Sequence, residues 1–320
     1  MNKKPQSLHP RNPHQGRYDF DALVSTCPDL SAFIKPNPKG DNTIDFADAK
    51  AVFCLNRALL AHYYQVHQWH IPEGYLVPPI PGRADMIHYL ADLLADGDTV
   101  AVGKSKGKKI KVLDIGTGAN CIYPVIGSQT YGWQFVASDI DPVSIEVAKL
   151  IVESNPGLKK LIKPVLQTDP ELIFTGVIKA GEHFDLTLCN PPFHASIEEA
   201  QEANSRKVKN LGLNKEKEKG RGKGKGKVKG AKPQNNNFGG KKAELWCTGG
   251  ELGFITKMAE QSVEYAEQVG WFSSLVSKSE NVPELQKRLK RLGAVDVRVI
   301  PMAQGQKISR IIAWRYKKTS

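Results

Sequence analysis

The sequence predicts an α/β fold for this chain of 320 residues, a Rossmann-like, doubly wound and mostly parallel seven-stranded sheet. Three observations lead to this prediction. Between residues 110 and 189, short apolar runs alternate with helical patterns, and this βαβ rhythm builds parallel sheets. Glycines follow the first apolar run, where a strand would turn into a helix. Near the end of the chain, two β-rich runs joined by a short glycine-containing link predict an antiparallel pair.

Two helices are expected before the sheet. Apolar residues recur at helical spacing from Asp45 to about Trp69, and a second helix is expected from Ala84 to Ala95. With 40% hydrophobic residues, the chain can bury one large core and a smaller appended region. We therefore expect residues 1–109 to form an N-terminal helical extension and residues 110–320 to form the sheet domain.

The elements of the sheet domain follow one another along the chain. Seven strands are expected at 110–115, 134–139, 161–166, 184–189, 270–276, 294–300 and 309–316. Helices are expected after Asn120, over Pro142–Glu153, from Glu251 to about Gln268 and from Pro283 to near Gly293. Pro164 lies inside the third strand and favours a short strand or an edge position, because proline cannot donate to a sheet ladder.

The most informative motif, Asn190-Pro191-Pro192-Phe193, follows the strand expected at 184–189. A motif of this kind is suited to holding the exocyclic amine of adenine against a methyl donor. The nitrogen of this amine is a poor nucleophile because its lone pair is delocalised into the ring. The Asn190 carboxamide oxygen and the Pro191 carbonyl could accept its two N–H protons and direct the lone pair at an electrophile. The two prolines make the turn stiff and offer only acceptors, and Phe193 could stack on an exposed base. The alternative is an ordinary proline turn after a strand.

A second motif, Gly116-Thr117-Gly118, follows the strand that ends near Asp114. Glycines there let the backbone pass close to a ligand. Cys121 occupies the position of the third glycine in a dinucleotide fingerprint, which argues against a nicotinamide or flavin site. Asp139 ends the next strand, about 20 residues on, where an acid can bind ribose hydroxyls. These features indicate an adenosine-containing cofactor without a pyrophosphate, and S-adenosylmethionine fits.

Composition excludes several other classes of protein. No apolar run approaches membrane-spanning length, and the polar N-terminus lacks a signal-peptide core. The five cysteines are odd in number and share no C-x-x-C spacing, which indicates reduced thiols in the cytoplasm, with neither a disulfide framework nor a zinc site. We expect no metal, no membrane partner and, by default, a monomer.

From Leu8 to its end, the chain resembles the bacterial 23S ribosomal RNA adenine-N6 methyltransferase F family, and more distantly eukaryotic small-nuclear-RNA adenine methyltransferases. The resemblance rests on Leu8–Asn12, Pro78–Asp85, Asp114–Pro124, Cys189–His194, Asn210–Asn214, Glu244–Cys247 and Met302–Lys307. It implies a class I methyltransferase fold, S-adenosylmethionine as the methyl donor, and N6 of one adenine in 23S rRNA as the acceptor. The ribosomal target comes from the resemblance alone.

The resemblance also implies roles for individual residues. Asn190, Pro191, Pro192 and Phe193 match the catalytic motif of the family. Its cofactor-binding positions match Asp114, Gly116, Thr117, Gly118 and Asn120, with Asp139 as the ribose-binding acid. In related enzymes, an arginine at the position of Arg83 reaches the methionine carboxylate, because the forked guanidinium matches the shape of a carboxylate. The resemblance implies the same role for Arg83. Gln167 follows the third strand and is expected near the adenine ring.

The net charge of +12 is concentrated in one segment. Residues 206–232 contain 12 lysines or arginines and two acids, a local charge of +10, which leaves +2 for the rest of the chain. Alternating Gly and Lys cannot build a core, so we expect residues 205–237 to form a flexible basic insert, either an arm for RNA phosphates or a tolerated loop insertion. Residues 1–16 are polar and basic, and we expect them to become ordered only on RNA.

Two alternatives remain at this stage. Asn-Pro-Pro-aromatic motifs also serve methylation of DNA adenine and of protein glutamine, so the acceptor could be another RNA, DNA or a protein. The chain could also be a non-catalytic RNA-binding or ribosome assembly factor built on a methyltransferase scaffold. The intact motifs at Asn190–Phe193 and Gly116–Gly118 argue against the second alternative.

Overall fold

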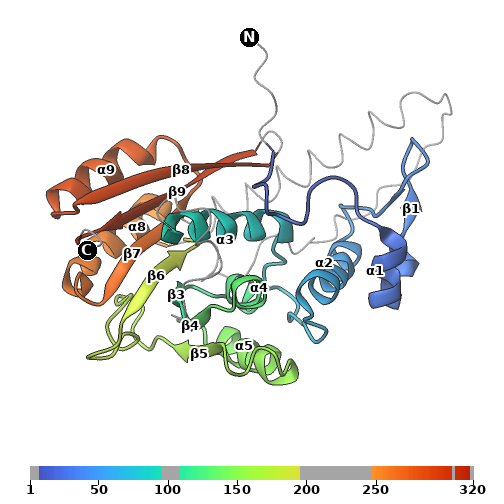
Figure 1. Cartoon of the computed structure of the whole chain (residues 1–320), viewed down its shortest axis with the longest axis horizontal. Coiled ribbons are helices and arrows are strands. Elements are labelled where there is room, and N and C mark those ends of the chain that lie inside the picture. Colours follow the sequence, from blue (N-terminus) through green and yellow to red (C-terminus); the bar gives the residue numbers. More distant parts are fainter. Residues whose placement is uncertain (1–6, 96–108, 195–246, 305–306, 318–320) are drawn as a thin grey trace, which may run out of the picture.

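The computed structural model describes residues 7–95, 109–194, 247–304 and 307–317, and it contains the expected seven-stranded sheet (Figure 1). The strands lie in the order β5-β4-β3-β6-β7-β9-β8. Their bounds are β3 Lys111–Ile115, β4 Gln134–Asp139, β5 Ile162–Leu166, β6 Phe184–Cys189, β7 Val269–Val276, β8 Asp296–Gln304 and β9 Lys307–Arg315. Strands β5, β4, β3, β6 and β7 pair in parallel, whereas β9 runs antiparallel to both β7 and β8, so the predicted topology is confirmed.

Helices cover both faces of the sheet, as a doubly wound fold requires. Their bounds are α1 Phe20–Thr26, α2 Ala49–Tyr64, α3 Ile80–Ala95, α4 Ile122–Tyr131, α5 Pro142–Ser154, α8 Gly250–Ser262 and α9 Asn281–Arg291. Successive strand residues point to opposite faces, and Val112 and Leu113 of β3 accordingly belong to two different hydrophobic clusters. The larger cluster contains α2, α3, α4 and α5, and the smaller contains α8 and α9.

Several small elements were not predicted from the sequence. A 3-10 helix at Pro28–Phe33 follows α1, and a two-stranded ribbon pairs β1 (Lys35–Pro36) with β2 (Asn42–Thr43). A second 3-10 helix, Val263–Tyr265, follows α8, which is therefore shorter than the helix expected up to Gln268. These elements are too short to show a periodic pattern of apolar residues in the sequence.

The expected helix over residues 45–69 is shorter in the structure, because both of its ends are fixed by local caps. Asp48 accepts hydrogen bonds from the backbone N–H groups of Lys50 and Ala51 and begins α2. Gln65 adopts a left-handed conformation (φ 56°) and ends it. In contrast, α3 begins four residues earlier than expected, at Ile80, and accommodates Pro81 in its first turn.

Pro164 lies in an edge strand, one of the two alternatives that its sequence context favoured. Strand β5 pairs only with β4 among the described strands, and Pro164 faces Ala137 in that parallel ladder. An edge strand needs inter-strand hydrogen bonds on one side only, so a residue without an N–H is tolerated there.

The expectation that residues 1–16 order only on RNA is wrong for residues 7–16, which pack on α2 and α3. His9, Asn12 and His14 are each at most 4% exposed. The backbone N–H of His9 and the side-chain amide of Asn12 both donate to Asp85 Oδ1, at 2.7 and 2.9 Å. The ring of His14 hydrogen-bonds the Tyr64 hydroxyl at 2.8 Å. Buried polar groups with specific partners hold this segment, although its composition is that of a flexible arm.

Replacing Asn12 by Ala should lower the free energy of unfolding by about 1.5–3 kcal/mol. Burial already raises the pKa of Asp85, and the side chain of Asn12 opposes this shift by donating to the carboxylate. The variant would leave that buried oxygen with one donor fewer. Urea denaturation measures the change, with Asn42→Ala, an exposed asparagine on β2, as the matched control. Equal stability of the two variants would contradict this account.

The N-terminal extension and the sheet share one hydrophobic core. The larger cluster contains Leu23 and Leu59 from the extension together with Val112 and Leu186 from the sheet. The division at residue 109 into an extension and a methyltransferase domain stays a prediction. The basic insert at 205–237 lies outside the described residues.

Candidate active site

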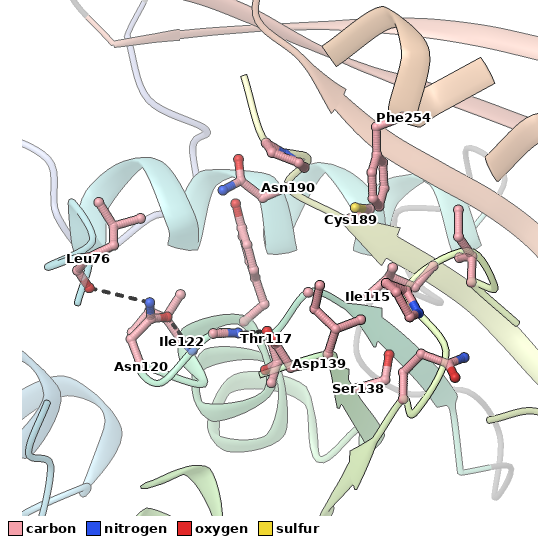
Figure 2. Close-up of a pocket in the computed structure, with 18 of the residues that line it drawn as sticks. Leu76, Ile115, Thr117, Asn120, Ile122, Ser138, Asp139, Cys189, Asn190 and Phe254 are labelled. Atoms are coloured by element: carbon pink, nitrogen blue, oxygen red, sulfur yellow. Dashed lines mark hydrogen bonds between the residues drawn. The ribbon is translucent and has the colours of Figure 1, made fainter. Parts of the chain in front are cut away.

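A cleft opens at the carboxyl ends of β3, β4 and β6, where parallel sheets place their ligand sites (Figure 2). The empty space within it, counted out into open solvent, is about 950 Å³. The predicted site residues that line it come from five segments far apart in the sequence. They are Arg83, Gly116, Thr117, Gly118, Asn120, Asp139, Gln167, Asn190 and Pro192.

Backbone conformation and backbone hydrogen bonds hold the glycine turn between β3 and α4 in place. Gly116 and Gly118 have φ angles of 73° and 63°, in the left-handed region that favours glycine. The N–H groups of Gly116 and Thr117 both donate to the Ser138 carbonyl at 2.9 Å, which ties the turn to the end of β4. Asn120 is 5% exposed, and its Oδ1 accepts from the N–H of Ile122, the first residue of α4. This turn therefore forms one wall of the cleft.

Asp139, at the end of β4, is aligned by two backbone N–H groups. Its Oδ2 accepts from Gly118 at 2.8 Å and its Oδ1 accepts from Asp141 at 2.9 Å. Burial raises the pKa of this carboxyl, and these backbone donors oppose the shift. Each oxygen keeps a further lone pair, so the carboxylate can accept from ligand hydroxyls.

Asp114 is buried beneath the glycine turn and does not itself line the cleft. Burial raises the pKa of its carboxyl to about 7, while the nearby Thr117 hydroxyl and Arg83 guanidinium oppose the shift. Thr117 is close enough to favour the charged form, yet neither Asp114 oxygen has a hydrogen-bond partner of normal geometry among the described residues. A buried carboxylate without a partner is costly, and a cationic ligand group would relieve it.

Asn190 follows β6, lines the cleft and carries an unpaired acceptor. Its Oδ1 is buried and has no hydrogen-bond partner within the described part of the chain. Figure 2 shows the side chain across the cleft from Thr117 and Asp139. Pro192 also lines the cleft, whereas Pro191 is buried and Phe193 is half-buried against the larger hydrophobic cluster. Phe193 therefore lies beside the cleft, after the two prolines.

Gln167 lines the cleft, but its side chain also has a structural task. Its Nε2 donates to the carbonyl of Thr175 at 2.9 Å, and its Oε1 accepts from the N–H of Asp169 at 3.0 Å. The residue holds the loop that follows β5, and Pro170, Leu172 and Ile173 of this loop line the cleft as well.

Several lining residues were missed by the sequence reasoning. They are Leu76, Ile115, Ile122, Tyr123, Ser138, Ile140, Pro170, Leu172, Ile173, Cys189 and Phe254. Most are apolar and carry no recognisable chemistry, and Phe254 reaches the cleft from α8, beyond the basic insert. Ile115, Ile122, Tyr123 and Cys189 lie within the matching stretches Asp114–Pro124 and Cys189–His194, and that membership was the available signal.

The start of α8, which carries Phe254, is fixed by a buried carboxylate. Glu251 is 1% exposed and accepts from the N–H groups of Ser277 and Lys278 and from the side chain of Asn281. Because these donors lie at the end of β7 and the start of α9, Glu251 ties α8 to the same edge of the sheet as Asn190. This network holds Phe254 over the cleft.

The polar groups of the cleft match a nucleoside joined to an amino acid. An aligned carboxylate at Asp139 suits hydroxyls, and the guanidinium of Arg83 suits an anion. The partnerless carboxylate of Asp114 lies beneath the glycine turn and adds negative charge behind that wall of the cleft. Apolar side chains at Ile140 and Leu172 suit a planar ring. The donor set therefore fits an adenosyl amino acid.

The sequence profile of an RNA methyltransferase family matches residues 2–318. The chain belongs to this family. It is 60% identical to the ribosomal RNA large subunit methyltransferase F of Desulfotalea psychrophila, over 97% of this chain and 95% of that protein. It is 51% identical to the protein of the same name from Cronobacter sakazakii, over 100% of this chain and 96% of that one.

Solved structures agree with this family and fold. The human METTL16 catalytic domain, determined with a MAT2A 3′UTR hairpin, superimposes with a TM-score of 0.77 at 28% identity, covering 98% of this chain and 96% of that one. The N-terminal domain of human METTL16 with SAH gives 0.73 at 26% identity, covering 98% of this chain and 100% of that one. The fold is thus that of a class I methyltransferase.

The described residues lack two further features. No helix within them is long and apolar enough to cross a membrane. No group of three or more His, Cys, Asp or Glu side chains in the described ranges could hold a metal ion.

Proposed function

We propose that this protein methylates N6 of one adenine in 23S rRNA, with S-adenosylmethionine as the methyl donor. The single observation that carries the chemistry is the buried, unpaired Asn190 Oδ1 at the cleft. Other buried polar atoms of the described residues, such as Thr187 Oγ1, also lack a partner, but Asn190 lines the cleft directly after a parallel strand. A ligand N–H would complete this acceptor, and the amino group of adenine supplies one. Support for rRNA comes from the relatives named as ribosomal RNA large subunit methyltransferase F.

The donor would be held along the cleft by residues of known geometry. Asp139 would accept from the ribose hydroxyls, and Arg83 would pair with the carboxylate. Asp114 would attract the ammonium group from behind the glycine turn, without direct contact. Gly116 and Gly118 allow the backbone to approach closely. When bound, S-adenosylmethionine supplies an electrophilic methyl group on its sulfonium.

The catalytic motif would prepare the acceptor. Asn190 Oδ1 and the carbonyl of Pro191 would accept the two N–H protons of the adenine amino group, so that the nitrogen lone pair is directed at the methyl carbon. Phe193 would stack on the base after it leaves its helix or strand. The C–N bond forms as the S–CH₃ bond breaks, and water takes the proton released from nitrogen. Positioning and two accepted hydrogen bonds supply most of the rate enhancement.

Transfer of a labelled methyl group from S-adenosylmethionine to unmodified, deproteinised 23S rRNA tests the proposal. Digestion to nucleosides should show the label in N6-methyladenosine. Assembly particles of the large subunit, tRNA and duplex DNA serve as alternative acceptors in parallel. Label in particles alone would identify a particle as the substrate, and label in DNA or tRNA alone would contradict the ribosomal target. Failure to bind S-adenosylhomocysteine would contradict the enzymatic function itself.

A further inference from the structure

We propose that Tyr123 is a positioning residue for the methyl donor: its hydroxyl holds the Arg83 guanidinium in place for the donor's carboxylate and thereby sets selectivity for the amino-acid end. This inference rests on the proposed function. Tyr123 was not among the expected site residues, yet it lines the cleft and is 3% exposed.

The contact between the two side chains is direct. Arg83 Nη1 donates to the Tyr123 hydroxyl at 2.6 Å, and the guanidinium carbon lies 5.3 Å from the centre of the Tyr123 ring. Arg83 belongs to α3 in the N-terminal extension, and Tyr123 belongs to the first turn of α4. The pair therefore joins the extension to the helix that follows the glycine turn.

The backbone before Tyr123 leaves the side chain little freedom. Cys121 adopts a left-handed conformation with φ 49°, which is uncommon for a residue with a side chain. The N–H of Ile122 donates to Asn120 Oδ1. These two features fix the start of α4, and the buried ring of Tyr123 has only two side-chain torsions to order. The hydroxyl is thus a rigid anchor for a long and flexible arginine.

The Tyr123 hydroxyl binds Nη1 of the guanidinium and does not occupy the Nε–Nη2 edge, which suits a carboxylate. A guanidinium pairs side-on through Nε and Nη2, and Tyr123 occupies Nη1. Arg83 Nε is buried and has no hydrogen-bond partner among the described residues. A planar carboxylate at this edge would give the unpaired Nε an acceptor.

The anchor also prevents a competing ion pair. Asp114 is close enough to Arg83 for the guanidinium to favour its charged form, yet no hydrogen bond joins the two side chains in the described structure. Without the Tyr123 hydroxyl, Arg83 would be free to turn to this partnerless carboxylate. Such a pair would neutralise both groups and close the subsite to an amino acid, which needs one anion and one cation separated.

The test compares two ligands that differ in the amino-acid end. S-adenosylhomocysteine carries the carboxylate and the ammonium group, and 5′-deoxy-5′-methylthioadenosine carries neither. Calorimetry should show that Tyr123→Phe weakens binding of S-adenosylhomocysteine by about 10-fold, the effect of one hydrogen bond to a charged group. Binding of methylthioadenosine should change by less than about twofold. At saturating donor, kcat should stay close to that of the wild type while KM rises.

Two further variants make the result decisive. In an Arg83→Ala background, Tyr123→Phe should cause no additional loss, because the residue acts only through Arg83. Tyr131→Phe, on the same helix but bonded to Arg11 and His88 outside the cleft, should leave both affinities unchanged. Equal losses for both ligands, no loss for either, or full additivity with Arg83→Ala would overturn the inference. If the wild-type protein bound neither ligand, the proposed function would fail as well.

Discussion

Replacement of Asn190 by Ala should lower the rate of methyl transfer at saturating donor by at least about 100-fold, the usual cost of losing one preorganised polar contact to the reacting group. The affinity for S-adenosylhomocysteine should change by less than about twofold, because Asn190 faces the acceptor base and the donor is held by other residues. Single-turnover transfer to unmodified 23S rRNA measures the first quantity, and calorimetry measures the second.

Two outcomes would contradict the role of Asn190. The first is loss of donor binding in a folded Asn190→Ala protein, which would assign the residue to the cofactor. The second is a rate close to that of the wild type, which would leave the unpaired Oδ1 without a catalytic task. The exposed Asn42→Ala serves as the matched control and should retain full activity.

Asp114→Asn should have opposite effects on donor binding and on the stability of the ligand-free protein. Affinity for S-adenosylhomocysteine should fall by about 10-fold, because the donor's ammonium group loses the negative charge that lies behind the glycine turn. At pH 8 the free energy of unfolding should rise by up to about 4 kcal/mol, because Asn removes the cost of an ionised, partnerless carboxylate. Urea denaturation and calorimetry of the same samples give both quantities.

The sign of the pH dependence follows from the direction of the shift. Burial raises the pKa of Asp114 from 3.8 to about 7, so the folded state holds a proton that the unfolded state releases. This contribution to stability is fully present below about pH 4 and is lost as the pH rises towards 7. Donor affinity should move the other way and increase as the pH rises through 7. A wild-type affinity that is flat between pH 5.5 and 8.5 would contradict this assignment.

The sheet could be predicted from the sequence because its signals are local. Each strand is an apolar run ending in a recognisable turn, and Pro164 favoured a short strand or an edge position for β5, which lies at the edge. The seven strands and the antiparallel closing pair followed from order along the chain. Helix ends were less certain, since they depend on caps such as Asp48 and on backbone conformations such as that of Gln65.

Residues 7–16 show where composition misleads. The segment is polar and basic, yet His9 and Asn12 each contact Asp85 on α3, more than 70 positions away in the sequence. No local period can reveal such a contact, because the partner is chosen by the packing of two helices. For the same reason the sequence did not predict that Phe254 lines the cleft, because this residue follows the basic insert and is far from the motifs in the chain.

By itself, the sequence determined the fold class, the glycine turn, Asp139 at the next strand end and the motif that begins at Asn190. These are features of residue type and order, and a parallel sheet brings the carboxyl ends of its strands to one edge. Only the tertiary structure shows which charged side chains are buried without a hydrogen-bond partner. Asp114 and Arg83 are over 30 positions apart, and only the docking of α3 against α4 sets Tyr123 beside Arg83 and leaves the carboxylate of Asp114 without a partner. Whether a charged group is buried and whether it has a hydrogen-bond partner depend on every element that surrounds it, so only the tertiary structure shows them.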